Sequence, residues 1–212
     1  MFAENRRLER NPAVLDAVKA KFFVNEIIGL SRYETDGLFL EGTGSMVLDR
    51  ENKITYACLS PRTNEKILDE FCKMTGYTPV TFRATDIARI DIYHTNVMMC
   101  IAKTFAVVCL ESVTDEAQRT NLLASLIKTN KDIVDISLQQ LNHFAGNMLQ
   151  VINEEGELLL VMSTQAYQSL TTAQIEILKK HNRIIHSPLN TIEAAGGGSA
   201  RCMMAEIFLK KK

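Results

Sequence analysis

Apolar, strand-like runs recur along the chain at a nearly constant interval. Three such runs, each ending on a polar residue, align at Tyr56–Ser60, Val107–Glu111 and Leu159–Ser163. The last residues of successive runs are 51 and 52 positions apart. A fixed period of this length is typical of blades or solenoid units, in which each repeat is one supersecondary structure. The pattern therefore predicts a chain built from similar consecutive units.

A helix-like segment follows each of these runs, and another lies near the start of the chain. The start of each is indicated by a capping residue, as in Asn11-Pro12, or by capping-box spacing, as between Thr171 and Gln174. Gly76 is expected to end one of the helices, because glycine readily adopts the left-handed conformation found there. The expected helix starts are Asn11, Ser60, Thr114 and Thr171.

A short strand is expected after each helix. These segments are rich in Val, Ile and Phe, which favour strands. They are Phe22–Ile28, Thr78–Phe82, Asp132–Ile136 and Arg183–His186, and one more strand is expected at Met203–Leu209. The unit is thus strand, strand, helix, strand, which excludes an all-β propeller. It permits a doubly wound sheet or a ring of small α/β blades in one domain, residues 1–212.

Chemically reactive side chains occupy matched places in the repeats. Glu41, His94, Asn147 and Cys202 each stand just before an upstream strand, at spacings of 53, 53 and 55 residues. A stacked sheet gives no reason for such matched positions, whereas a ring brings them to its centre. The pattern favours the ring and predicts one site assembled from several repeats.

Composition excludes several classes of protein. The formal net charge is -1, with 46% hydrophobic and 23% charged residues, as in an ordinary globular protein. Near-neutral charge gives no reason to expect a nucleic acid or an anionic membrane as partner. No apolar run approaches the roughly 20 residues that span a bilayer. Five cysteines without a pairing pattern fit reduced thiols in a cytoplasm.

Cys202 follows a glycine run, Gly196–Gly198, and is preceded directly by Arg201. The glycines allow close approach of the backbone to a ligand, and a cysteine beside a cation is placed to act as a thiolate nucleophile. A buried inert thiol is the alternative. The run lacks the lysine and hydroxyl residue of a P-loop. Three other cysteines lie in apolar segments and are expected to be inert: Cys58, Cys100 and Cys109.

Each of the other matched residues has one functional interpretation and one structural alternative. His94 suits general acid–base catalysis, because an unperturbed imidazole titrates near pH 6.5; the alternative is a hydrogen-bonded rim histidine. Glu41 suits the binding of a guanidinium or amidine by charge-assisted hydrogen bonds; the alternative is a surface acid. Asn147 is either part of the site or a turn residue. No metal-ligand spacing occurs, so neither a metal nor a cofactor is expected.

Four ordered motifs resemble a known group, the bacterial citrulline utilisation hydrolases. This is the amidinotransferase-like branch of the guanidine-modifying superfamily, which also contains arginine deiminase, dimethylarginine dimethylaminohydrolase and glycine amidinotransferase. The resemblance runs almost from end to end. The motifs are Phe39–Ser45, Ile92–Met99, Phe144–Leu149 and Gly196–Met203.

The resemblance implies an α/β-propeller, the pentein fold, of ββαβ blades around a polar centre. It implies a catalytic set of Glu41, His94 and Cys202, with Cys202 as the covalent nucleophile. The position that holds an aspartate in arginine deiminases is Asn96 here. Because an amide can donate as well as accept hydrogen bonds, Asn96 favours a neutral ureido substrate such as citrulline over a cation. The other residues expected to bind substrate are Asn147, Gly198 and Arg201.

Similar proteins have a longer N-terminal part, so we expect this chain to hold about four of five blades, with Met1 at an internal position of the family. Unpaired strands at the open edges would favour a homodimer. The expected activity is hydrolysis of a C–N bond in a small ureido or guanidino substrate. Two alternatives stay open: transfer of an amidino group to an amine, and an inactive truncated remnant.

Overall fold

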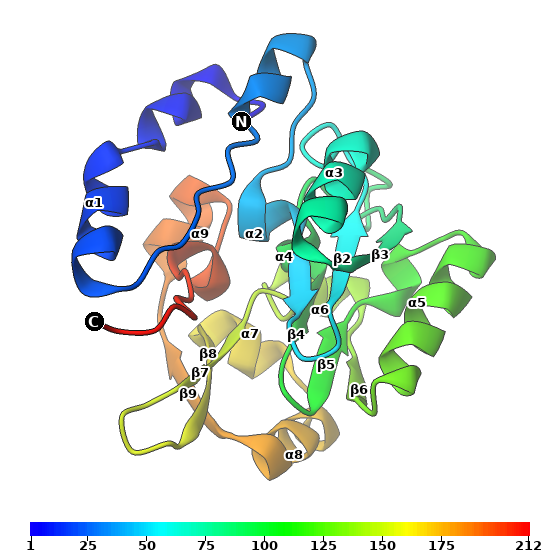
Figure 1. Ribbon diagram of the computed structural model, residues 1–212. Coiled ribbons are helices and arrows are strands. Elements are labelled where there is room, and N and C mark those ends of the chain that lie inside the picture. Colours follow the sequence, from blue (N-terminus) through cyan, green and yellow to red (C-terminus); the bar gives the residue numbers. More distant parts are fainter.

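Three successive parts of the chain each form a small three-stranded sheet in the computed structural model, which describes residues 1–212 (Figure 1). In every sheet the first two strands are antiparallel, and the middle strand pairs with the third in parallel. The strands are β1 (Val47–Asp49), β2 (Ile54–Cys58) and β3 (Thr78–Phe82); β4 (Met99–Ile101), β5 (Phe105–Val108) and β6 (Asp132–Asp135); and β7 (Leu149–Ile152), β8 (Leu158–Ser163) and β9 (Arg183–Ser187). The predicted ββαβ order is confirmed for these three units.

The helices that cross from the middle strand to the third begin at side-chain caps. They are α3 (Glu65–Thr75), α5 (Glu116–Lys128), and the pair α7 (Thr164–Ser169) and α8 (Thr172–His181). The capping box at Thr171 and the left-handed stop at Gly76 are confirmed. Two predicted starts are wrong. Asn64, not Ser60, caps α3, because Ser60 and Thr63 bond to each other in a tight turn. Asp115, not Thr114, caps α5.

A short helix precedes the first strand of each unit. These helices are α2 (Gly42–Ser45), α4 (Thr95–Met98) and α6 (Leu138–Asn142). Glu41 and His94 are the residues immediately before α2 and α4, so one helical turn separates each of them from its strand. Asn147 lies in the loop before β7. The matched spacing of Glu41 and His94 thus reflects matched positions in the first two units, whereas Asn147 follows the short helix of its unit.

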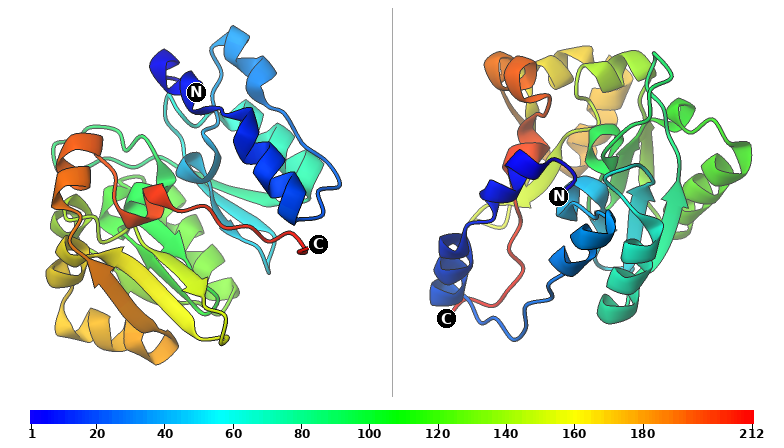
Figure 2. Two further views of the ribbon diagram at one scale, coloured as in Figure 1. Left: turned by 90° about the vertical axis from the view of Figure 1, so that its left-hand side faces the viewer. Right: turned by 90° about the horizontal axis from the view of Figure 1, so that it is seen from above.

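The two terminal parts contain helices joined by irregular segments, and neither forms the strand predicted for it. The N-terminal part holds 3₁₀ turns at Glu4–Glu9 and Ser31–Asp36 around α1 (Pro12–Lys21), and the C-terminal part holds α9 (Asn190–Gly196) and a 3₁₀ turn at Ala200–Met203. The strands predicted at Phe22–Ile28 and Met203–Leu209 are not formed. The two segments meet only near their ends, at a bridge between Phe22 and Lys211 (Figure 2), which leaves most backbone groups without a ladder partner. Three units are therefore formed, and the expected blade count is not confirmed.

The hydrophobic core is centred on the middle unit. All four residues of β5 are buried, and Leu122 and Leu126 of α5 pack over this sheet with Val134 of β6. The first strand of this unit, β4, contacts β1 on one side and β7 on the other. Because the first strands are neighbours, the segments that precede them meet on one side of the molecule. That side carries the candidate site.

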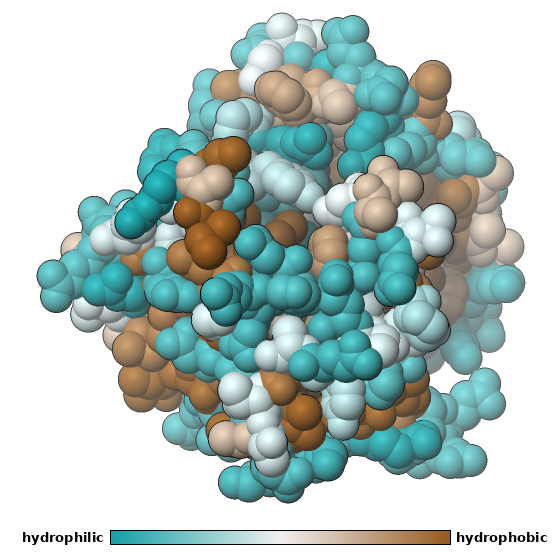
Figure 3. Space-filling model, turned by 180° about the vertical axis from the view of Figure 1, so that it is seen from behind, coloured by the Kyte–Doolittle hydropathy of each residue, from teal (hydrophilic) through white to brown (hydrophobic).

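The surface has no continuous apolar face in the view from behind, where hydrophobic groups are separated by hydrophilic ones (Figure 3). None of the helices combines the length and the apolar character that crossing a bilayer requires.

A buried ion pair joins the first two units. The ammonium group of Lys131 lies 3.2 Å from Asp49 Oδ2 and donates to the Lys103 carbonyl at 2.8 Å, and both charged side chains are only 2% exposed. The Asp49 carboxylate also accepts from Asn52, at 3.0 to 3.2 Å. With every charge satisfied, this pair fixes how the end of β1 meets the start of β6.

Replacing Lys131 with methionine is expected to lower the free energy of unfolding by about 3–5 kcal/mol, because it leaves the Asp49 carboxylate buried without a cation. Urea denaturation followed by circular dichroism measures the change. The matched control is Lys179→Met, which breaks an exposed pair with Glu176 and should change stability by less than about 1 kcal/mol. Equal effects of the two substitutions would show that the buried pair is not important to the fold.

Candidate active site

A cavity of about 750 Å³ lies among the starts of α2 and α4, the loop between α9 and the Ala200–Met203 turn, and the N-terminal part of the chain. Six of the seven residues proposed from the sequence line it, and the seventh, Asn147, lies directly behind the sulfur of Cys202. The six are Glu41, His94, Asn96, Gly198, Arg201 and Cys202. The structure thus brings together in one place residues that the sequence spreads over three repeats and the C-terminal segment.

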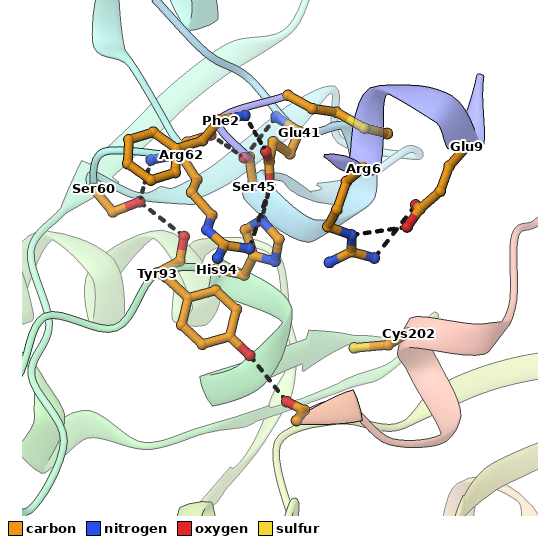
Figure 4. A network of polar contacts seen from close by, with 12 residues as sticks. Phe2, Arg6, Glu9, Glu41, Ser45, Ser60, Arg62, Tyr93, His94 and Cys202 are labelled. Atoms are coloured by element: carbon orange, nitrogen blue, oxygen red, sulfur yellow. Dashed lines mark hydrogen bonds and ion pairs between the residues drawn. The ribbon is translucent and has the colours of Figure 1, made fainter. Parts of the chain in front are cut away.

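Glu41 and His94 form a hydrogen-bonded pair at one wall of the cavity (Figure 4). His94 Nε2 lies 2.7 Å from Glu41 Oε2, and Glu41 Oε1 accepts the backbone N–H of Phe2 at 2.7 Å. The guanidinium of Arg62 approaches the same carboxylate at 3.8 Å. Each oxygen of Glu41 therefore has a partner, and the carboxylate fixes the orientation of the imidazole ring.

Burial and the neighbouring charges set the protonation state of this pair. Burial lowers the pKa of His94 below its ordinary value of 6.5, and the bond to Glu41 offsets this only in part. Burial raises the pKa of Glu41, but the Phe2 N–H and His94 together outweigh burial and leave that pKa below its ordinary value of 4.5. At neutral pH the pair is accordingly a carboxylate and a neutral imidazole, which is the state that can accept a proton.

Gly44 allows the imidazole to sit close to α2. A methyl group at this position would lie 2.9 Å from the Cε1 and Nδ1 atoms of His94, inside van der Waals contact. Any larger residue would push the ring away from its place. Gly44 of the Phe39–Ser45 motif therefore leaves the space that the imidazole occupies.

Cys202 stands on the opposite side of the cavity, in the Ala200–Met203 turn, with its sulfur directed into the space below His94 (Figure 4). The N–H of Cys202 donates to the Ser199 carbonyl at 3.0 Å, which holds the turn. Gly197 has a positive φ of 64°, and a methyl group on Gly198 would lie 3.1 Å from the sulfur. The glycine run therefore gives the chain its sharp bend and leaves the thiol accessible.

The other four cysteines are buried. Burial raises the pKa of Cys58 and Cys100 to about 12, and that of Cys72 and Cys109 to about 11. Protonated, buried thiols are poor nucleophiles. The prediction that Cys58, Cys100 and Cys109 are inert agrees with this burial, and Cys202 is the exposed thiol of the chain.

Two buried amides flank the sulfur of Cys202. Asn147 Nδ2 lies 3.2 Å from the sulfur and also donates to the backbone carbonyl of Asn96 at 2.8 Å, while Asn96 Nδ2 lies 3.8 Å from the sulfur. The Oδ1 atoms of both side chains are buried and have no hydrogen-bond partner in the protein. An unpaired buried acceptor is costly, and of these two residues Asn96 lines the cavity whereas Asn147 lies behind it.

Arg201 is less available than the sequence suggests. Its side chain is 8% exposed, donates to the Met204 carbonyl at 3.1 Å and lies 3.9 Å from Glu206. Arg201 lines the cavity, but these contacts hold its guanidinium against the C-terminal segment. The cysteine also does not stand at the start of a strand, because the residues from Met204 onward form no ladder with a neighbour.

Sequence reasoning missed two residues that surround the Glu41–His94 pair. Tyr93 lines the cavity with its ring centre 4.9 Å from that of His94, and Arg62 lies over the Tyr93 ring at 4.8 Å. The signal for Tyr93 was present, since an aromatic residue directly before a candidate catalytic histidine must lie near the same site. Arg62 gave no such signal, because it follows a turn whose position the sequence did not reveal.

Comparison with known families assigns the chain to a class. It belongs to the family described as N,N dimethylarginine dimethylhydrolase, eukaryotic, which matches residues 1–209. The narrower branch of citrulline utilisation hydrolases is not confirmed by this match. No curated protein sequence matches the chain.

Several solved structures have the same mixed α/β fold. The apo structure of ArgZ, an arginine dihydrolase from the ornithine–ammonia cycle in cyanobacteria, matches with a TM-score of 0.69 and 17% identity, over 99% of this chain and 31% of that one. The N-terminal domain of an ArgZ variant, covalently bonded to a reaction intermediate, matches with a TM-score of 0.68 and 20% identity, over 95% and 66%. Unliganded AgrE matches with a TM-score of 0.60 and 18% identity, over 82% and 24%. The chain thus spans 31% and 66% of the first two structures, and at these identities the likeness establishes the fold.

Proposed function

We propose that this protein hydrolyses a C–N bond of a ureido or guanidino compound through a covalent intermediate on Cys202. The observation that carries the proposal is the meeting, in one cavity, of an accessible thiol with a histidine–carboxylate pair. Membership in the dimethylarginine dimethylhydrolase family supports the reaction class. Nucleophile, base and orienting carboxylate are the parts that covalent catalysis by cysteine requires.

In the proposed reaction the sulfur of Cys202 attacks the planar carbon of the substrate while the thiol proton passes to neutral His94. The resulting imidazolium gives this proton to the departing amine, and the C–N bond breaks. His94 then takes a proton from water, whose oxygen attacks the S-linked intermediate. The S–C bond breaks, and the proton returns from His94 to the sulfur. Glu41 stabilises the imidazolium that forms in each half of the cycle.

The surroundings of the thiol favour a neutral ureido group over a guanidinium. The side chains that donate to the sulfur are the neutral amides of Asn96 and Asn147, and the Glu41 carboxylate is already bonded to His94 and Phe2. A guanidinium would lose its hydration without gaining a free carboxylate, which is costly. A ureido NH₂ group offers N–H donors to the unpaired Asn96 Oδ1 and carries no charge. Citrulline is accordingly the substrate that we propose.

The substrate is tested by incubating the protein with L-citrulline, L-arginine or dimethylarginine and identifying the products by mass spectrometry. We expect ornithine from citrulline, with a kcat/KM at least roughly ten times that for arginine. A higher kcat/KM for arginine would contradict the choice of a ureido substrate but not the role of Cys202. Product formation that requires an added amine such as glycine would show group transfer in place of hydrolysis.

We also propose a reducing compartment such as the cytoplasm for this chemistry. All five cysteines are free, and the nucleophile must stay reduced to act.

A further inference from the structure

The cysteine loop must be held against the half of the site that carries His94. His94 precedes α4 in the middle unit, whereas Cys202 follows the glycine loop at the C-terminal end of the chain. Catalytic groups have to stay within about 0.5 Å of their working geometry. The contacts that join these two segments therefore decide how well the nucleophile and the base are aligned.

The side chain of Tyr93 makes such a contact. Its hydroxyl donates a hydrogen bond of 3.0 Å to the backbone carbonyl of Gly197, in the glycine loop that leads to Cys202 (Figure 4). Its main chain is continuous with His94, and the two rings lie 4.9 Å apart. One side chain thus connects the base with the loop that presents the nucleophile.

Two neighbours, Arg62 and Ser60, determine the position of Tyr93. Arg62 stacks on it at 4.8 Å, and the same guanidinium reaches Glu41 at 3.8 Å. Ser60 donates to the Tyr93 carbonyl at 2.8 Å and so fixes the backbone. The ring is therefore tied to both members of the Glu41–His94 pair and is not free to turn away from the glycine loop.

The Tyr93 hydroxyl stays protonated over the pH range in which an enzyme works. Burial, followed by the charge of Cys202, raises the pKa of this phenol above its ordinary value of 10, and the nearby arginines offset this only in part. The group remains a donor, and the Gly197 carbonyl remains bonded.

We infer that Tyr93 is a positioning residue, which holds the glycine loop so that the sulfur of Cys202 faces His94. The expected change in kcat rests on the proposed function. The expected change in the order of residues 196–199 does not depend on it. Gly197 benefits from this support, because it stands at a positive φ in a run of three glycines, which have few conformational restraints of their own.

The test is Tyr93→Phe, which removes only the hydroxyl. We expect kcat to fall roughly 10- to 100-fold, because small displacements of a reacting group have effects of this size. KM should change by less than about threefold, since the ring that lines the cavity is kept. Amide hydrogen exchange at residues 196–199 should become several-fold faster, reflecting the loss of one hydrogen bond.

Tyr167→Phe is the matched control. Tyr167 is half-buried against His186, with ring centres 4.3 Å apart, and does not line the cavity. Removing its hydroxyl should leave kcat, KM and the exchange at residues 196–199 unchanged. A second variant, Tyr93→Leu, removes the ring as well and should raise KM in addition to lowering kcat.

Two results would overturn the inference. One is a Tyr93→Phe protein with wild-type kcat and wild-type exchange at residues 196–199. The other is slower turnover with unchanged exchange, which would assign the hydroxyl to the chemistry and not to positioning. If the wild-type protein acts on none of the three compounds, the proposed function fails. The exchange rates and the rate of Cys202 alkylation by iodoacetamide still decide the role of Tyr93, because we expect both to change in Tyr93→Phe and not in Tyr167→Phe.

Discussion

Replacing Cys202 with alanine is expected to lower kcat by at least about 10⁴-fold, because it removes the one thiol that lines the cavity and with it the proposed covalent intermediate. The side chain is exposed, so its loss should leave the fold intact. Steady-state turnover of citrulline measures the change, and thermal unfolding checks the fold. With the wild-type protein, rapid acid quenching during turnover should trap an S-linked adduct that intact mass spectrometry detects. The adduct should be absent from Cys202→Ala.

The matched control is Cys72→Ala. Cys72 is buried in α3 beside Leu68 and takes no part in the cavity, so its substitution is expected to reduce stability modestly and to leave kcat unchanged. Iodoacetamide provides an independent check, since it should modify Cys202 of the native protein and leave the four buried thiols unmodified. An adduct on another cysteine, or turnover by Cys202→Ala, would contradict the assignment of the nucleophile.

The repeat could be predicted from the sequence because it follows from patterns of local origin. Strands such as β2 and β8 are continuous apolar runs, and Thr171 with Gln174 forms a capping box from residues three positions apart. Neither requires knowledge of distant parts of the chain. The matched positions of Glu41 and His94 were informative for the same reason, since equal units place equivalent residues at equivalent points.

The errors arose where a long-range contact decides the structure. The segments at 22–28 and 203–209 have strand-like composition, but a strand also needs a neighbouring ladder, and they meet only near Phe22 and Lys211. Asn64 replaced Ser60 as a helix cap because Asn64 N–H bonds to the Phe39 carbonyl, 25 residues earlier, and holds the turn there. Sequence periodicity carries no information about such a contact.

The same limit applies inside the candidate site. The sequence identified which residues meet, but it did not reveal which of their atoms are already bonded. Arg201 was expected to bind substrate, yet its guanidinium is bonded to Met204. Asn96 was chosen because it replaces a carboxylate, and the structure adds that its amide N–H faces the sulfur while its oxygen is unpaired. The unpaired atoms, more than the residue types, define what a ligand must provide.

Replacing His94 with alanine is expected to lower kcat by roughly 10²- to 10⁴-fold, because one group serves as proton acceptor for the thiol and for water and as donor to the leaving amine. The fold should tolerate the change, since the ring borders the cavity. Single-turnover experiments should show slow formation of the S-linked adduct and slow release of product. Unchanged single-turnover rates would remove His94 from the mechanism.

The pH dependence tests how Glu41 acts on His94. Activity requires the neutral imidazole, so kcat/KM should fall on the acid side as His94 becomes protonated, with a midpoint below 6.5 because burial lowers its pKa. The Glu41 carboxylate raises the pKa of His94, so Glu41→Gln should lower that pKa further and move the acid limb to lower pH. Turnover should fall as well, because the glutamine stabilises the imidazolium less than the carboxylate does. An acid limb that stays in place in Glu41→Gln would show that another group controls it, and the pair at 2.7 Å would then be an orienting contact without influence on proton transfer.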